Sequence, residues 1–344
     1  MMKKNTRLII ILTGIILLPY CHDPFEHRYN QGTFPDIPVN MGNINSMYDD
    51  YNSTSPILGG TAPLCFSSNR GSNGGNFDIV YKLLDVIMTR SDGKISVEEN
   101  TNGNMDIATV NSNLNTAVSI INTSSDELGP YLIPKSVRVE KIGNGYYGYQ
   151  NYILLYASNE SGNLDIKFTQ NVTGESYTAP QNIAFLNSAA DEAYPTLTED
   201  SAYIYFCSNR SGNFDIFKAD LNKQGDLLTL LGDPTPRTIT KDADLSSDYD
   251  DKCPYILGNL LVFASNRPGG YGGFDLYYAV FKDGKWSSPV NFGNKINTPY
   301  DEYRPIVKTY GDEFTNNFMI FSSNRPGGKG GFDLYYVGID KMAE

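Results

Sequence analysis

One short pattern occurs five times along the 344 residues of this sequence. Its first half is an aromatic residue, one small residue and a Ser-Asn pair, and in four copies Arg follows this pair. Its second half, a few residues later, is an Asp between two apolar residues. The copies begin at Phe66, Tyr156, Phe206, Phe263 and Phe321. A turn rich in Gly and Asn separates the two halves, so we interpret each copy as a β-hairpin. Five equivalent hairpins predict a fold assembled from five similar units.

Two further strand signals surround each hairpin. An apolar stretch that usually contains proline follows it, and an acidic pair precedes it. The acidic pairs are Asp49-Asp50, Asp126-Glu127, Asp191-Glu192, Asp250-Asp251 and Asp301-Glu302. Four short strands in every unit are typical of the blades of a β-propeller. We therefore predict an all-β, five-bladed β-propeller over residues 35–344.

The two ends of this region complement each other. Residues 38–50 parallel residues 289–302 almost position for position, so the region begins with the fourth strand of a blade. The last copy ends after Phe332-Asp-Leu-Tyr-Tyr-Val337, which is a third strand without its fourth. We predict that residues near 36–42 add the outer strand to the last blade and close the ring, which leaves no blade unpaired at the join.

Residues 85–125 are longer than the repeat requires. They contain Gly103-Asn-Met-Asp-Ile107, which echoes the hairpin pattern. We interpret them as an insertion on the first blade, and a six-bladed ring is the alternative.

The sequence of the N-terminal 34 residues predicts an export signal and a tether rather than part of the folded domain. Lys3, Lys4 and Arg7 precede an apolar run over residues 8–18, which is shorter than the roughly 20 residues of a membrane-spanning helix. We predict a signal peptide over residues 1–20, a lipid attached to Cys21, and a tether over residues 21–34. The protein would then be exported to the periplasm or the cell surface as an outer-membrane lipoprotein. A plain secreted protein is the alternative.

Charge and composition exclude several function classes. The formal net charge of −12 argues against nucleic-acid binding, because a phosphate backbone would be repelled. The two histidines, His22 and His27, lie outside the repeats, so the propeller cannot hold a histidine-based catalytic group. Cys65, Cys207 and Cys253 are predicted to be small buried residues rather than nucleophiles.

The hairpin sequence Ser-Asn-Arg-Pro-Gly-Gly-x-Gly-Gly-Phe-Asp-Leu-Tyr resembles the WD40-like repeat of TolB-type periplasmic proteins; the second copy departs from it, with Glu160 in place of Arg. The resemblance implies a non-enzymatic scaffold in the bacterial cell envelope that presents a rim of loops to a protein partner. The alternative is a carbohydrate-binding or carbohydrate-active propeller, similar to a glycosidase or a lyase, with a glycan as its partner.

The repeated charges supply the candidate binding rim, because the acidic pairs and the Ser-Asn-Arg turns should emerge on one face. The rim residues are Arg70, Arg210, Arg267, Arg325, Asp191, Glu192, Asp301 and Glu302. Arginine forks suit carboxylates, so the arginines are expected to pair with these acids or with the Asp in the second half of the hairpin pattern. The functional alternative is a ring of carboxylates around the channel mouth that holds a cation or a basic peptide.

Two sets of aspartates remain. One recurs at the same hairpin position, where short acidic side chains commonly bind turn backbone, and we interpret its members as structural: Asp78, Asp165, Asp215, Asp275 and Asp333. The other, Asp242, Asp244 and Asp248, partly resembles a calcium loop but lacks its Gly and Glu, so a solvated acidic loop is the default and Ca²⁺ the alternative. No other cofactor is expected.

Overall fold

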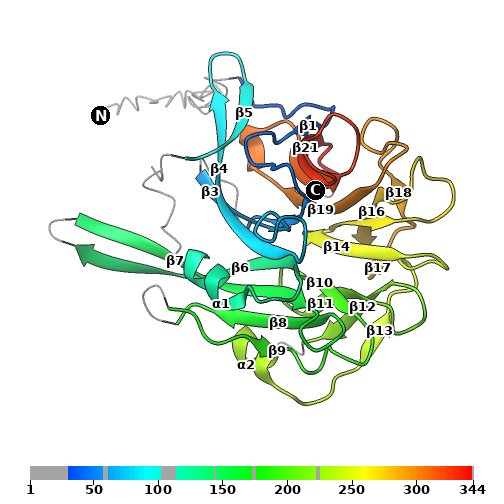
Figure 1. Cartoon of the computed structure of the whole chain (residues 1–344). Coiled ribbons are helices and arrows are strands. Elements are labelled where there is room, and N and C mark those ends of the chain that lie inside the picture. Colours follow the sequence, from blue (N-terminus) through cyan, green and yellow to red (C-terminus); the bar gives the residue numbers. More distant parts are fainter. Residues whose placement is uncertain are drawn as a thin grey trace, which may run out of the picture.

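The computed structural model describes residues 30–56, 61–101, 114–142, 145–172, 176–221 and 225–342. These residues form five antiparallel sheets around a common centre, one for each repeat (Figure 1). The five-bladed β-propeller is therefore confirmed. The predicted signal peptide, the lipid site Cys21, and both histidines lie outside the described residues. Within the described residues, no helix is long and apolar enough to cross a membrane.

Each sheet runs from an inner strand at the axis to an outer strand at the rim. Blades 1 and 2 contain β2 (Asp50–Thr54), β3 (Thr61–Ser68), β4 (Asp78–Thr89) and β5 (Lys94–Glu99), then β6 (Glu127–Ile142), β7 (Gly145–Ser158), β8 (Asp165–Gln170) and β9 (Gln181–Asn182). Blade 3 contains β10 (Glu192–Leu197), β11 (Tyr203–Ser208), β12 (Asp215–Asp220) and β13 (Ile239–Lys241). Blade 4 contains β14 (Asp251–Leu257), β15 (Leu260–Ser265) and β16 (Asp275–Lys282), with β17 (Lys285–Trp286) and β18 (Val290–Asn291) both paired to β16. Blade 5 contains β19 (Glu302–Lys308), β20 (Asn317–Ser323), β21 (Asp333–Ile339) and β1 (Val39–Asn40).

The second strands of the blades form the centre of the core. Every residue of β3, β15 and β20 is buried, because neighbouring blades cover both faces of these strands. A strand covered on both faces has a continuous apolar sequence instead of an alternating one. Apolar side chains such as Phe66, Phe263 and Phe321 fill the space between blades.

The ring closes as the sequence predicts. Strand β1 pairs with β21, with Val39 opposite Tyr336 and Asn40 opposite Tyr335. In Figure 1 the first strand lies beside the last, although nearly 300 residues separate them. Phe34 precedes β1, is 1% exposed, and stacks on Phe314 with 4.9 Å between the ring centroids. The N-terminal segment therefore contributes both backbone pairing and core volume to blade 5.

One hydrogen bond recurs at every junction between blades. The first Asp of each acidic pair accepts it from the backbone N–H just before the third strand of the preceding blade. The pairs are Phe77–Asp126, Leu164–Asp191, Phe214–Asp250, Phe274–Asp301 and, across the closure, Phe332–Asp49, at 2.7–2.9 Å. We call this contact the interblade clamp. Since blade 5 and blade 1 make it too, the closing junction is chemically equal to the other four.

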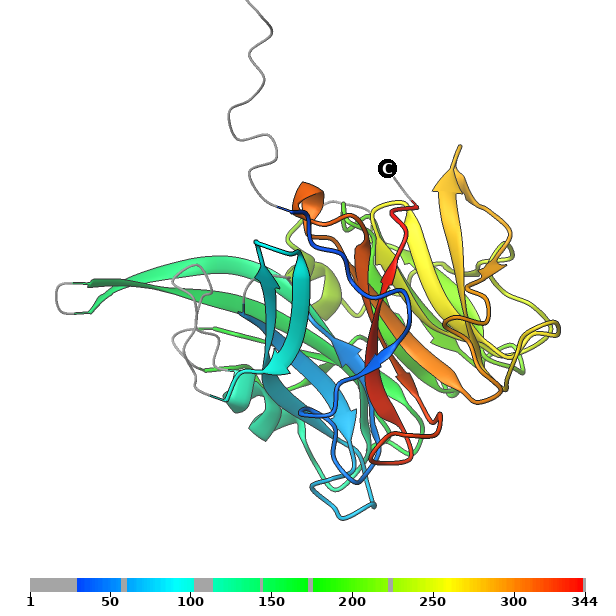
Figure 2. The same cartoon turned by 90° about the horizontal axis from the view of Figure 1, so that it is seen from above.

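The segment 85–125, predicted as an insertion, contains both strand and helix. Its first part is the end of β4 and the whole of β5, which is the outer strand of blade 1. Its last part holds helix α1 (Leu114–Ile121), whose Leu114, Ala117 and Ile121 pack into a core cluster with Cys65 and Tyr152. Residues 102–113 lie outside the described part. The long β6–β7 hairpin of blade 2 extends well beyond the ring (Figure 2).

Deleting residues 30–45 should remove cooperative unfolding. Blade 5 would lose its outer strand, and the core would lose Phe34. We expect the fluorescence of Trp286 and the far-ultraviolet circular dichroism to give separate transitions in denaturant rather than one. Ile37→Ser, at a side chain that is 66% exposed in the same segment, serves as the control and should leave the transition unchanged. A single unaltered transition in the deletion variant would contradict the closure.

Candidate functional site

The predicted rim arginines form ion pairs with the second acid of each acidic pair. The pairs are Arg70–Asp50 (2.5 Å), Arg210–Glu192 (3.0 Å), Arg267–Asp251 (2.6 Å) and Arg325–Glu302 (2.9 Å). The predicted pairing is confirmed for these second acids, whose side chains are fully buried. The predicted rim residues Asp191 and Asp301 accept interblade backbone hydrogen bonds instead. Each arginine also donates to a backbone carbonyl in the loop that enters its blade: Ile44, Leu186, Leu245 and Ile296. The structure uses these side chains to hold each blade to its entry loop, and a binding role for the rim stays a prediction.

Blade 2 lacks this ion pair. Glu160 replaces the arginine and pairs instead with Lys167 at 2.5 Å. Glu127 is left with neutral donors, the backbone and hydroxyl of Thr123 and the hydroxyl of Ser158. Burial raises the pKa of Glu127 above its ordinary value. Blade 2 therefore satisfies its buried carboxyl group through hydrogen bonds alone.

The repeated hairpin aspartates bind their own turns. Asp275 accepts from the backbone of Tyr271 and Gly272, and Asp333 accepts from the backbone of Lys329 and Gly330. Asp165 and Asp215 accept from the hydroxyls of Ser161 and Ser211. Burial raises the pKa of Asp78, the fifth member. The structural interpretation is thus confirmed for the four with turn contacts.

The structure does not gather the candidate calcium ligands. Asp242 pairs with Lys218 at 3.1 Å, whereas Asp244 and Asp248 are exposed. The described residues contain no group of three or more His, Cys, Asp or Glu side chains that could hold a metal ion. Cys65, Cys207 and Cys253 are buried free thiols, as predicted.

The five inner strands differ at the axis, although their first residues are equivalent. Each strand contains a bulge, and its third residue has a positive φ of 46–58°. These third residues are Asn52, Gly129, Tyr194, Cys253 and Arg304. They contact one another across the ring: Asn52 Nδ2 donates to the Tyr194 hydroxyl at 3.4 Å, and the Arg304 guanidinium lies 5.4 Å from the Tyr194 ring centroid. The axis is therefore filled at this level by four different side chains, and the Tyr194 ring takes the space beside Gly129.

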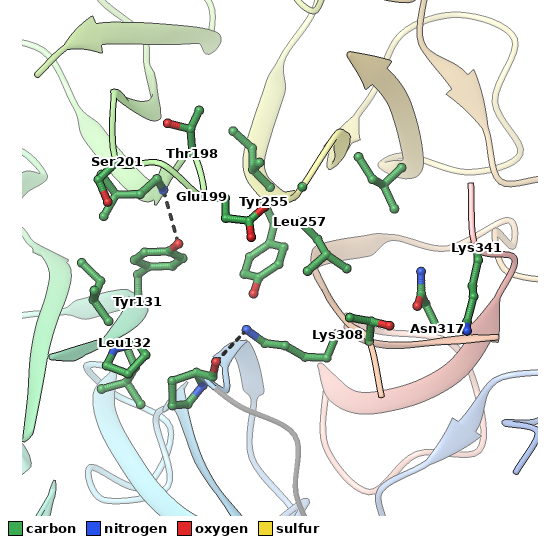
Figure 3. A pocket seen from close by; sticks show the side chains of 18 residues that line it. Tyr131, Leu132, Thr198, Glu199, Ser201, Tyr255, Leu257, Lys308, Asn317 and Lys341 are labelled. Atoms are coloured by element: carbon green, nitrogen blue, oxygen red, sulfur yellow. Dashed lines mark hydrogen bonds between the residues drawn. The ribbon is translucent and has the colours of Figure 1, made fainter. Parts of the chain in front are cut away.

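A pocket of about 580 Å³ opens at the far ends of the inner strands, on the side opposite the ion pairs. The inner strands or the turns that follow them supply most of its lining, and all five blades contribute (Figure 3). Its volume lies within the range usual for small-molecule sites.

Two tyrosines and a lysine form the middle of the pocket. Tyr131 and Tyr255 meet edge to face, with 6.2 Å between ring centroids, and the Tyr131 hydroxyl accepts from the Leu197 backbone at 3.3 Å. Lys308 Nζ donates to the Pro56 carbonyl at 3.3 Å and lies 5.2 Å from the Tyr255 ring centroid. Burial penalises the ammonium ion and lowers the pKa of Lys308 to about 8.

Polar groups from other blades surround this centre. Glu199 and Ser201 come from the turn between β10 and β11, Asn317 from β20, and Lys341 from the segment after β21 (Figure 3). Glu199 reaches toward blade 4, since a Cβ added at Gly258 would lie 4.0 Å from its Oε2 atom. Aromatic walls with a few converging polar groups are typical of ligand sites.

None of these pocket residues is among the residues predicted from the repeat. Lys308 could have been found from the sequence by comparing the repeat copies at positions where they differ. The seventh residues of the inner strands, counted from the second acid, are Pro56, Ile133, Thr198, Leu257 and Lys308. Lys308 is the charged member of an otherwise uncharged set. Alignment of the inner strands on their acidic pairs would have identified it.

We compared the chain with known protein families, sequences and solved structures. Neither a protein-family model nor a curated protein sequence matches the chain. Among solved structures, an exo-β-1,3-galactanase from Phanerochaete chrysosporium matches with a TM-score of 0.50 and 14% identity, over 89% of this chain and 65% of that chain. An α-L-arabinofuranosidase from Podospora anserina matches with a TM-score of 0.48 and 13% identity, over 90% and 96%. An endo-arabinase from Bacteroides thetaiotaomicron matches with a TM-score of 0.48 and 12% identity, over 92% and 100%. At these identities the likeness concerns the fold.

These matches correct the sequence-based assignment. The propeller architecture is shared with the exo-β-1,3-galactanase, and the assignment to TolB-type, WD40-like repeat proteins is wrong. The predictions that followed from it, a non-enzymatic scaffold and a protein-binding function, are corrected with it. The predicted envelope protein partner and the lipid anchor at Cys21 gain no support from the comparisons. The misleading residues were the Asn, Arg and Asp of the repeat, which the structure uses to build blades.

Gly129→Ala should strongly destabilise the ring. Gly129 has a φ of +58°, and a Cβ there would lie 2.4 Å from Cδ1 of Tyr194. We expect a loss of about 3 kcal/mol or more in the free energy of unfolding, from backbone strain plus overpacking. Gly311→Ala is the matched control, because Gly311 has a φ of +62° but nothing within 4 Å of the added Cβ, and it should cost about 1 kcal/mol. Equal losses in denaturant titrations would contradict close packing at the axis.

Proposed function

We propose that this chain is a carbohydrate-active propeller that takes a glycan into the axis pocket. The observation that carries the proposal is the convergence of Tyr131, Tyr255, Lys308 and Glu199 on one pocket at the axis. Aromatic faces supply apolar contact area, and the neighbouring polar groups can bind sugar hydroxyls. The match to the galactanase, a structure described in complex with galactose, is consistent with a glycan ligand.

Glu199 is the group that we assign to proton transfer. It is exposed and is the one carboxylate among the described residues that line the pocket. Cleavage of a glycosidic bond, by hydrolysis or by elimination, requires a proton on the leaving oxygen, and a positioned carboxyl group can provide it. The predicted export signal in residues 1–20 would bring such an activity to the glycans of the cell envelope or its surroundings.

Tyr255→Ala should weaken glycan binding. Loss of the ring removes one aromatic wall of the pocket and the contact with Lys308. In calorimetric titrations with oligosaccharides of arabinan, galactan and pectin, we expect affinity for the bound glycan to fall at least tenfold. Tyr271→Ala is the control, because Tyr271 is 49% exposed in the Gly-rich turn before β16 and does not line the pocket. Failure of the wild-type protein to bind any of these glycans would overturn the proposal.

Glu199→Gln should reduce turnover while binding persists. The amide keeps the shape of the side chain but cannot transfer a proton, and loss of general acid catalysis typically costs 10²–10⁴-fold in rate. Release of new chain ends from the bound glycan measures the effect. Glu313→Gln, at an exposed acid outside the pocket, should leave the rate unchanged. Equal rates for Glu199→Gln and wild type would remove Glu199 from this role.

A further inference from the structure

The described lining of the pocket has more basic than acidic side chains, although the protein as a whole is acidic. The whole chain has a formal net charge of −12, yet the described pocket lining contains Lys308 and Lys341 against a single carboxylate, Glu199. Recessed sites with one sign of charge concentrate ligands of the opposite sign. The local excess of positive charge thus opposes the overall charge of the molecule and points to the chemistry of the ligand.

Lys308 has no carboxylate partner in the described part of the chain. Other half-buried lysines do, since Lys167, Lys218 and Lys252 each pair with an acid. Among the described residues, the Lys308 ammonium group donates to the Pro56 carbonyl and lies beside the Tyr255 ring. An ammonium ion has three N–H donors, so donors remain for a ligand in the pocket.

Arg304 adds a second uncompensated cation on the same strand. It is fully buried on the axis, and its Nη2 atom donates to the Pro130 carbonyl at 3.2 Å. Its Nε and Nη1 atoms have no hydrogen-bond partner within the described residues. Guanidinium groups stay protonated in proteins, so β19 carries two positive charges along the axis, one of them at the pocket.

We propose that the pocket selects a glycan whose sugar carries an anionic group, the carboxylate of a uronic acid or a sulfate ester, and that Lys308 Nζ binds this group. The inference rests on the proposed function of the same pocket. A charge-assisted hydrogen bond to the anionic group would compensate the desolvated ammonium ion. A neutral sugar in the same place would leave that charge buried without a counterion, and this is the basis of discrimination.

The proposal has a pH signature. Because the pKa of Lys308 is about 8, its ammonium group is protonated at neutral pH and loses its proton as the pH rises above 8. The other titratable groups around it are Tyr131 on β6, Tyr255 on β14, Glu199 on the β10–β11 turn and Lys341 after β21. Burial raises the pKa of both tyrosines, so they stay neutral over this range. Preference for an anionic glycan should therefore decline above pH 8.

The test compares three tetrasaccharides of equal length: a galacturonate oligomer, a sulfated galactan oligomer and a neutral galactan oligomer. Calorimetric affinities are measured at about pH 7 and about pH 9, on either side of the lysine transition, for wild type, Lys308→Met and Lys308→Arg. We expect wild type at neutral pH to favour one anionic oligomer over the neutral one by roughly 10-fold or more. Lys308→Met should lose the preference. Lys308→Arg should keep it and show no decline at the higher pH.

The outcomes separate this inference from the proposed function. Preference for galacturonate or for the sulfated oligomer supports the inference and tells which anion is bound. Equal affinity for anionic and neutral oligomers, or a preference that survives Lys308→Met, overturns the inference while glycan binding in the pocket stands. Binding of none of the three by folded wild-type protein overturns the inference, and the proposed function falls with it when the arabinan oligosaccharides also fail to bind.

Discussion

The interblade clamp is the contact on which the ring depends. At each junction a carboxylate that begins one blade accepts a hydrogen bond from a backbone N–H of the preceding blade, and the junction between blades 5 and 1 uses the same bond, from Phe332 N–H to Asp49. A buried donor left without its acceptor costs about 1–3 kcal/mol. Neighbouring blades therefore pack stably only when each clamp forms. Because five equivalent junctions hold the ring from outside the axis, the inner strands are free to differ where they face one another.

We expect the functional site where the five blades differ from one another. The acidic ends of the inner strands are satisfied internally, by an arginine in four blades and by hydroxyl and backbone donors in blade 2. Their opposite ends, about 20 Å away at the seventh residue, carry side chains that differ between blades. Tyr255 and Lys308 lie at those ends, and Glu199 follows one of them. A scaffold built from repeats thus places an asymmetric pocket that contains Lys308 at the axis of an acidic protein.

The fold could be predicted from the sequence because the repeated residues are the ones that make the contacts within and between blades. The acidic pairs, the Ser-Asn-Arg turns and the closing strand near Val39 all follow from its spacing. It was insufficient for the site, because Lys308 and Tyr255 belong to no motif and become neighbours only when blades 4 and 5 meet at the axis. The resemblance to TolB-type repeats rested on the blade-building residues, and such residues carry no information about the ligand.

The most direct test of this account is a crystal structure of the protein soaked with whichever anionic tetrasaccharide, galacturonate or sulfated galactan, binds more tightly. The account predicts sugar density in the axis pocket, with a ring against Tyr255 and the carboxylate or sulfate within hydrogen-bond distance of Lys308 Nζ. Density at the rim formed by Arg267, Arg325 and their acids, with an empty axis pocket, would contradict it.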